Sequence, residues 1–369
     1  MTQSATAAQP ADDILFDVIN QVGLITLNRP KALNALSHPM VQAMSEQLDA
    51  WAADAGIRAV VLRGAGDRAF CAGGDIKTLY LQWQQERTVP QDFFIDEYRL
   101  DYQIHRYAKP FVALMDGIVM GGGMGLAQGA SLRVVTERTR LAMPETGIGL
   151  MPDVGASHFL SQMQRELAFY LGITGQAIGA ADALFCSLAD AFAPSAALAG
   201  LEQTLAAISW GDEPQADLYA ALGAGPEAPA APPLLDVLPA LYRHFSAPGV
   251  AATMQSLATE ADPRYRDWAQ QTLQTMQGRS PLMMNVTRRQ LLAGRRLDLA
   301  DCFRMELGLV RQSFETGDFI EGVRALIVDK DNAPRWQMLP AGTERERVDA
   351  FFASPWEKGR HPLAALGKH

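Results

Sequence analysis

The chain has 369 residues, of which 48% are hydrophobic and 20% are charged, so it can bury a large core. The net charge of −9 argues against a nucleic-acid-binding protein, because neutralising phosphates requires a basic surface. The longest uncharged stretch, 117–132, is too short and too rich in glycine for a membrane span. We therefore expect neither a nucleic acid nor a membrane as a partner.

The first residues and the cysteines bear on where the protein works. Residues 1–12 contain neither a basic nor an apolar leader segment, so they predict a short disordered tail and no secretory signal. Cys71, Cys186 and Cys302 are odd in number and widely spaced, which predicts free thiols in a reducing compartment. Together these features predict a cytoplasmic location.

Strands and helices alternate through the first half of the chain. In order, the predicted elements are a hairpin (14–19 and 23–27), a helix with an apolar stripe from Met40 to Trp51, a strand (58–63), a helix (91–107), strands (111–117 and 132–137) and a helix from about Ser157 to Gly172. A strand–helix–strand order is typical of βαβ architecture with right-handed crossovers. The sequence therefore predicts an α/β core over residues 13–210.

The composition shifts after this core. The Ala/Pro-rich stretch 211–233 predicts a linker or loop. Beyond it the hydrophobic pattern is wholly helical, over about 234–245, 250–259, 263–277, 281–293 and 298–315. We therefore expect a helical C-terminal region over residues 234–369.

Two glycine-rich segments follow predicted strands. They are FCAGGDIK (70–77) and GIVMGGGMG (117–125), and the second opens a predicted helix. Backbone N–H groups at such places can bind negative charge, and two aimed at one point would form an oxyanion hole. The alternative is that the glycines serve only turns and close packing.

Other common site motifs are absent from the sequence. Neither glycine segment has the spacing of a dinucleotide fingerprint or a phosphate-binding P-loop. Neither a nucleophile elbow nor a zinc-protease motif occurs, and the six histidines are scattered without ligand spacing. We therefore expect no metal and no bound cofactor.

Two carboxylates stand in the apolar segment AMPETGIGLMPDVG (142–155). Glu145 and Asp153 have no charged neighbours there. Burial would raise their pKa values toward a range useful for acid–base chemistry, and two such groups could divide the roles of base or nucleophile and proton donor. The alternative is that Glu145 caps a turn and Asp153 forms an Asx-turn.

Together these segments resemble the enoyl-CoA hydratase/isomerase (crotonase) superfamily. The matching runs are GLITLNRPKALNAL (23–36), RAVVLRGAGDRAFCAGGDIK (58–77) and DGIVMGGGMGL (116–126). AMPETGIGLMPDVG and DFIEGVRALIVDKDNAPRW (318–336) are similar to its 3-hydroxyisobutyryl-CoA hydrolase branch. The resemblance implies a ClpP/crotonase-like α/β spiral of repeated ββα units, with helices covering a C-terminal region.

The resemblance also implies roles for particular residues. The N–H groups of Gly74 and Gly122 would be the oxyanion-hole donors, and Glu145 and Asp153 would be the catalytic pair. The resemblance also implies a set of residues that would bind substrate or CoA: Gly74, Asp75, Ile76, Lys77, Glu97, Gly122, Arg29 and Lys31. The last two would meet CoA phosphates, although exposed cations beside a turn are the alternative.

One departure from the hydratases bears on the reaction. They carry a catalytic glutamate at the position of Gly125. This favours hydrolysis of a short branched 3-hydroxyacyl-CoA, as in valine catabolism, over hydration or isomerisation. An enoyl-CoA hydratase or isomerase is the first alternative, and a non-catalytic CoA-binding protein is the second. CoA would enter as part of the substrate, and a homo-oligomer is compatible with the resemblance.

Overall fold

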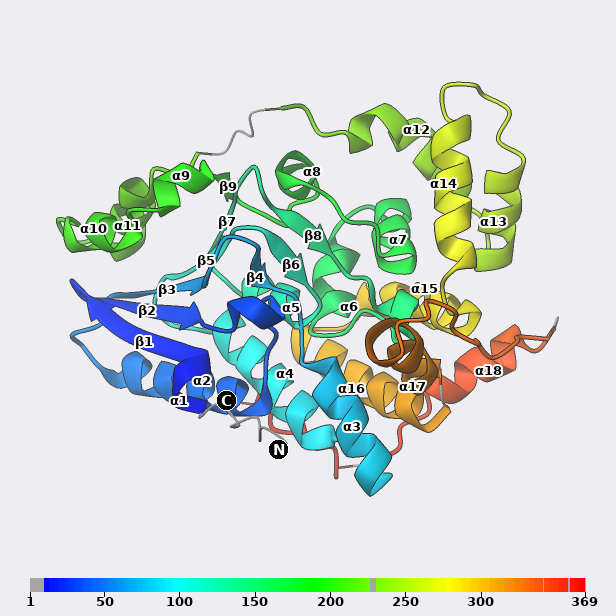
Figure 1. The fold of residues 1–369 in the computed structure, drawn as a ribbon, viewed down its shortest axis with the longest axis horizontal. Coiled ribbons are helices and arrows are strands. Elements are labelled where there is room, and N and C mark those ends of the chain that lie inside the picture. The colour runs from blue at the N-terminus through cyan, green and yellow to red at the C-terminus, as the bar shows by residue number, and fades with distance from the viewer. Residues whose placement is uncertain (1–9, 226–229, 317, 341, 358, 369) are drawn as a thin grey trace, which may run out of the picture.

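The computed structural model describes residues 10–225, 230–316, 318–340, 342–357 and 359–368 (Figure 1). One sheet has six strands in the order β1 (Ile14–Ile19), β2 (Val22–Leu27), β3 (Ala59–Gly64), β5 (Phe111–Met115), β7 (Leu132–Val135) and β9 (Ala191–Phe192). β1 and β2 form an antiparallel hairpin, and every later pair in this sheet is parallel. The predicted hairpin is therefore confirmed.

A second sheet has three parallel strands. They are β4 (Ala69–Cys71), β6 (Ile118–Met120) and β8 (Arg140–Ala142), with β6 in the centre. Each strand follows closely after a strand of the larger sheet, so the chain repeats a strand–strand unit before each helical segment. In both predicted glycine segments the run of glycines therefore follows the end of a strand, β4 in one and the neighbouring β6 in the other.

The helices of the first part of the chain are short to medium in length. They are α1 (Pro10–Asp13), α2 (His38–Ala53), α3 (Ile76–Glu86), α4 (Gln91–His105), α5 (Gly122–Gln128), α6 (Ala156–Phe159), α7 (Arg165–Thr174), α8 (Ala180–Phe185), α9 (Ser195–Leu198), α10 (Leu201–Ala206) and α11 (Pro214–Leu222). Three 3₁₀ turns accompany them: η1 (Pro30–Ala32), η2 (Glu145–Ile148) and η3 (Leu160–Gln162).

The predicted helical C-terminal pattern is also present. Its elements are α12 (Leu234–Phe245), α13 (Val250–Ala258), α14 (Arg266–Gln277), α15 (Pro281–Gly294), α16 (Leu299–Thr316), α17 (Asp318–Val323), the π-helical η4 (Arg324–Val328) and α18 (Glu344–Phe351). α15 packs on α6 and α7, α16 packs on α4 and α6, and α17 packs on η2. The C-terminal helices thus border the segment that carries Glu145 and Asp153.

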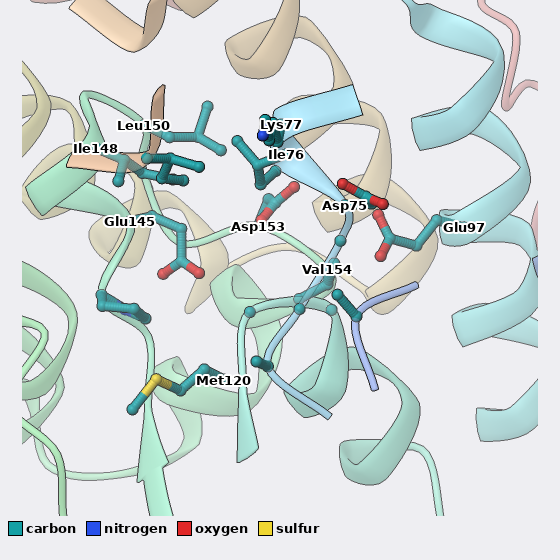
Figure 2. Close-up of a pocket in the computed structure, with 18 of the residues that line it drawn as sticks. Asp75, Ile76, Lys77, Glu97, Met120, Glu145, Ile148, Leu150, Asp153 and Val154 are labelled. Carbon is teal, nitrogen blue, oxygen red and sulfur yellow. The ribbon is translucent and has the colours of Figure 1, made fainter. Parts of the chain in front are cut away.

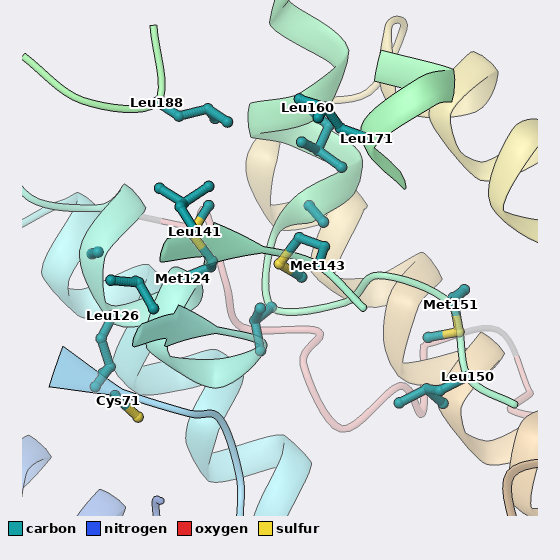
Figure 3. Packing of buried hydrophobic residues seen from close by; sticks show 14 of the residues in the cluster. Cys71, Met124, Leu126, Leu141, Met143, Leu150, Met151, Leu160, Leu171 and Leu188 are labelled. Carbon is teal, nitrogen blue, oxygen red and sulfur yellow. The ribbon is translucent and has the colours of Figure 1, made fainter. Parts of the chain in front are cut away.

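Both faces of the larger sheet are buried along its central strands β2, β3 and β5. Along β3, Val60 and Leu62 face the main cluster of apolar side chains, whereas Ala59 and Val61 face a second cluster with side chains of α10 and α11. A parallel sheet covered on both sides gives continuous apolar strands, which explains the run AVVL in this strand. Figure 3 shows the main cluster around the smaller sheet, where Cys71, Met124 and Leu141 pack together.

Three predictions differ in part from the structure. Residues 1–9 of the predicted tail lie outside the described residues, and Pro10–Asp13 are helical. The stretch 211–233 contains helix α11, which covers the sheet, so it is not simply a loop or linker. The helix expected from Ser157 to Gly172 is broken into α6, η3 and α7. The division into an α/β core and a helical region stays a prediction.

Candidate active site

A cavity of about 450 Å³ opens where the two glycine segments meet α4 and the 144–154 segment (Figure 2). Its lining includes eight of the ten residues predicted to form the site: Gly74, Asp75, Ile76, Lys77, Glu97, Gly122, Glu145 and Asp153. These residues come from four separate stretches of chain, so only the fold brings them together. Arg29 and Lys31 are not among the residues that line it.

The glycine segments bring two backbone N–H groups to one side of the cavity. An isolated bridge between Leu36 and Gly74 fixes the first segment, and Gly122 begins helix α5 in the second. A Cβ atom on Gly122 would lie 3.4 Å from the Gly74 nitrogen and 2.3 Å from Glu97 Oε1. Within the described residues, neither the Gly74 nor the Gly122 N–H donates a hydrogen bond. Both donors are therefore open to a ligand in the cavity.

The two predicted catalytic carboxylates are buried in this cavity. Glu145 begins the 3₁₀ turn η2, and Asp153 lies in the segment before α6; they are 6% and 5% exposed. Burial, and then the charge of Asp153, raises the pKa of Glu145 well above its usual value. Burial raises the pKa of Asp153 to about 6. Both groups therefore hold a proton more readily than exposed carboxylates do.

Helix α4 contributes two further groups to this cluster. The Tyr98 hydroxyl donates a 2.7 Å hydrogen bond to Asp153 Oδ2, and this bond opposes the effect of burial on the Asp153 pKa. Glu97 is 2% exposed, and its Oε1 has no hydrogen-bond partner among the described residues. Burial, and then the charges of Asp153 and Glu145, raises the pKa of Glu97 well above its usual value. Figure 2 shows Glu97, Asp153 and Glu145 around the same space.

The backbone after Asp153 has an unusual conformation. Val154 has φ 53° and Gly155 has φ 87°, and a β-branched residue is strained in this left-handed region. Two side chains of the C-terminal helices hold the segment. Glu306 of α16 accepts hydrogen bonds from the N–H groups of Gly155 at 2.8 Å and Ser157 at 2.7 Å. Gln290 of α15 donates to the Pro152 carbonyl. The helical region therefore fixes the position of Asp153.

The predicted phosphate-binding cations lie beside the cavity and are not part of its lining. The Arg29 guanidinium donates to the Ala35 carbonyl at 2.7 Å and to Asp75 Oδ2 at 3.0 Å, and it lies 3.4 Å from Asp13. Arg29 is therefore occupied by protein groups. Lys31 is exposed on the neighbouring turn η1. Phosphate binding by these two cations stays a prediction.

Several polar residues of the site were not predicted from the sequence. Glu306 and Gln290 act from distant helices, and no local pattern links them to Asp153. Tyr98 and Asp101 could have been predicted from the sequence, because both lie near Glu97 on the apolar, buried face of α4. Arg279 lies behind η2, where its positive charge opposes the rise in the Glu145 pKa.

The described residues offer neither a membrane span nor a metal site. None of their helices is long and apolar enough to cross a membrane. No group of three or more His, Cys, Asp and Glu side chains there is placed to hold a metal ion. The expectation that the protein needs no cofactor stays a prediction.

Comparison with known proteins identifies the family. The sequence profile described as Enoyl-CoA hydratase/isomerase matches residues 22–352. A Danio rerio protein named "3-hydroxyisobutyryl-CoA hydrolase, mitochondrial" is 37% identical over 94% of this chain and 91% of its own. A Gallus gallus protein of the same name is 38% identical over 93% of this chain and 89% of its own. A crystal structure titled as a carnitinyl-CoA dehydratase from Mycobacterium thermoresistibile has a TM-score of 0.83 at 35% identity, covering 94% of this chain and 98% of that one.

The chain belongs to the enoyl-CoA hydratase/isomerase family, and its fold is the crotonase fold. Within that family it belongs with the relatives named 3-hydroxyisobutyryl-CoA hydrolase. The resemblance drawn from the sequence, and the fold that it implied, are therefore confirmed.

The predicted cytoplasmic location is contradicted, because these relatives are named as mitochondrial proteins. The prediction rested in part on the free cysteines, and all three are buried. Burial raises the pKa of the Cys71 and Cys186 thiols to about 12. Buried thiols that stay protonated are inert, so they carry no information about the redox compartment.

Proposed function

We propose that this protein hydrolyses the thioester of a short branched 3-hydroxyacyl-CoA, namely 3-hydroxyisobutyryl-CoA, to the hydroxy acid and CoA. The activity named for its relatives in Danio rerio and Gallus gallus supports this substrate. A role in valine breakdown follows from that substrate. The observation that carries the proposal is the cavity itself, where two unpaired N–H groups and two buried carboxylates meet.

The N–H groups of Gly74 and Gly122 would form the oxyanion hole. They would bind the thioester oxygen as negative charge develops on it during attack at the carbonyl carbon. Their lack of partners supports this role, because a fixed donor needs no rearrangement when the charge appears. Asp75, Ile76 and Lys77, which follow Gly74 along the cavity wall, would bind the CoA chain.

Glu145 and Asp153 would act as a pair that shares a proton. Glu145 would either attack the carbonyl carbon or activate a water molecule, and both roles require its ionised form. Asp153 would accept the proton that Glu145 must lose, because protonation of Asp153 removes the negative charge that raises the Glu145 pKa. It would then return a proton to the leaving thiol. Glu97, with an unpaired oxygen on the cavity wall, would contact the acyl group.

Hydration of an enoyl-CoA is the second candidate, favoured by the similarity to a structure titled as a dehydratase. The space at position 125 argues against hydration, because a Cβ atom on Gly125 would lie 2.5 Å from Asp101 Oδ2 and 2.7 Å from Val154 Cβ. A glutamate side chain at this position therefore has no room.

Thiol release from a panel of acyl-CoA thioesters tests the proposal. We expect the fastest release from 3-hydroxyisobutyryl-CoA, with the purified full-length chain, and little loss of absorbance from crotonyl-CoA through hydration. Hydration of crotonyl-CoA at a rate matching the best thioester hydrolysis would make the hydratase the better assignment. Binding of acyl-CoA without turnover would instead indicate a non-catalytic CoA-binding protein.

A further inference from the structure

Three ionisable side chains follow one face of helix α4 at intervals of four residues. Glu97, Asp101 and His105 are successive i, i+4 neighbours, a spacing that places Cβ atoms about 5–6 Å apart. Glu97 lines the active-site cavity, Asp101 is 2% exposed, and His105 reaches the surface. This face packs on α5 and the residue after it, where Cβ atoms on Gly122, Gly125 and Gly129 would meet atoms of Glu97, Asp101 and His105 in turn, so it is enclosed along its middle. This row of three ionisable side chains therefore runs from the cavity to solvent.

Asp101 has no protein partner despite its burial. Neither Oδ1 nor Oδ2 forms a hydrogen bond with any described residue, and the same is true of Glu97 Oε1. The lack of a side chain at Gly125 leaves room for Asp101, since a Cβ atom there would lie 2.5 Å from Oδ2. Buried carboxylate oxygens without partners are costly, so they are expected to hold a proton or a water molecule.

A second, small cavity begins at Asp101. It has a volume of about 20 Å³, which is room for one water molecule, and its lining includes Asp101, His105, Gln128 and His158. The rings of His105 and His158 meet edge to face with centroids 5.8 Å apart. Partial burial lowers the pKa of both imidazoles, so both are neutral at pH 7 and able to accept a proton.

The charged groups around Glu97, Asp101 and the two histidines allow a proton to move along this row of side chains. Burial, and then the charges of Glu97, Asp153 and Glu306, raises the pKa of Asp101 well above its usual value. No cation is among the groups that shift it. At the outer end, the charges of His158 and Arg106 further lower the pKa of His105, and Asp298 acts in the opposite direction on His158. The inner groups therefore hold protons, and the outer groups release them to water.

Hydrolysis of a thioester requires such an exit. The C–S bond breaks, a C–O bond forms with water, and the products at neutral pH are a carboxylate, the CoA thiol and one free proton. The acyl-CoA itself would fill the mouth of the main cavity, so the proton needs another route. We propose that Glu97, Asp101 and the His105–His158 pair form a proton path from the active site to solvent. This proposal rests on the proposed hydrolase function.

Stopped-flow measurement of two signals tests the path. Thioester cleavage is followed by ultraviolet absorbance, and release of the proton is followed by a pH indicator in weak buffer. In the wild type we expect both signals to appear together. In Asp101→Asn, which keeps the shape but cannot relay a proton, bulk proton release should lag behind cleavage by at least about ten-fold in rate. Asp96→Asn is the matched control, because Asp96 lies on α4 but is half-exposed and bonded to His38.

The outer end of the path gives an independent test that does not depend on a buried substitution. The double variant His105→Ala/His158→Ala should show the same lag, and added imidazole should abolish it by replacing the missing acceptor. Proton release in step with cleavage in both Asp101→Asn and the double variant would overturn the path. So would a lag that imidazole leaves unchanged in the double variant. Absence of cleavage in the wild type would contradict the hydrolase function instead.

Discussion

Asp153 is the residue on which the proposed chemistry depends most directly. Its pKa of about 6 lies close to neutral pH, as the Tyr98 hydroxyl partly offsets the effect of burial. Such a group can both accept and donate a proton at the pH of a cell. No property of the segment MPDVG alone would give this value.

Replacing Asp153 with asparagine tests this role. The change keeps size and the capacity to hydrogen bond to Tyr98 but removes the titratable proton. We expect kcat to fall by about a hundred- to ten-thousand-fold, with CoA affinity nearly unchanged because the predicted CoA contacts lie elsewhere. Glu145→Gln should be at least as damaging, and the double variant should be far from additive. Near-wild-type thiol release from a folded Asp153→Asn protein would reduce Asp153 to a turn residue.

Gly122 has a close approach that only a glycine allows. A Cβ atom at this position would meet Glu97 Oε1 at 2.3 Å and block the space in front of the Gly74 N–H. We expect Gly122→Val to lower kcat by about a hundred- to a thousand-fold, the usual effect of losing an oxyanion donor. Gly249→Ala is the control, because a Cβ atom there meets nothing within 4 Å. Equal rates in the two variants would contradict the oxyanion assignment.

At the scale of elements, the C-terminal helices hold the segment that carries Asp153. The strained conformation at Val154 persists because Glu306 binds two N–H groups beyond it and Gln290 binds the carbonyl before it. These helices come more than a hundred residues later in the chain, and they pack directly on α4 and α6. The helical region therefore helps to shape the candidate active site.

Substituting Glu306 with glutamine tests whether helix α16 holds the segment after Asp153 in place. The amide nitrogen cannot accept a hydrogen bond, so one buried N–H of Gly155 or Ser157 would lose its partner, at about 1–3 kcal/mol. We expect kcat to fall about ten-fold or more, KM to change little, and the melting temperature to drop. Glu315→Gln lies on the same helix and removes only an exposed pair with Arg311, so it serves as the control. An unchanged kcat in Glu306→Gln would show that the segment holds its shape unaided.

At the scale of the whole molecule, buried acids make stability depend on pH. Burial raises the pKa of Glu306 to about 8, and raises those of Glu97, Asp101 and Glu145 well above their usual values. Between the unfolded and folded pKa values, the folded state binds more protons than the unfolded state. Stability must therefore fall as the pH rises through this range.

Urea unfolding at pH 7 and pH 8.5 tests whether the stability falls as the pH rises. In this window the histidines are mostly neutral in both states, so the slope is set by the buried acids and by the buried thiols, whose raised pKa values act in the same direction. We expect the free energy of unfolding to fall by up to about 1.4 kcal/mol per pH unit for each acid still protonated when folded. Asp101→Asn should show a shallower fall than the wild type. Stability that rises over this window would contradict the raised pKa values.

The sequence alone determined the family and the order of the elements, and it predicted eight of the residues that line the candidate site. Local patterns carry this information: apolar runs mark the strands, 3.6-residue periodicity marks the C-terminal helices, and glycine runs follow β4 and β6. Glu145 and Asp153 were found because isolated carboxylates in an apolar segment are conspicuous in the sequence itself.

The tertiary structure decided what depends on contacts between distant parts of the chain. Glu306 and Gln290 bind the backbone on either side of Asp153 across more than 130 residues, and their own surroundings in α16 and α15 give no sign of this role. The pKa values of Glu97 and Asp101 likewise depend on burial under other elements and on the charge of Asp153. Burial and through-space electrostatics are properties of the packed molecule, so no local pattern could reveal them.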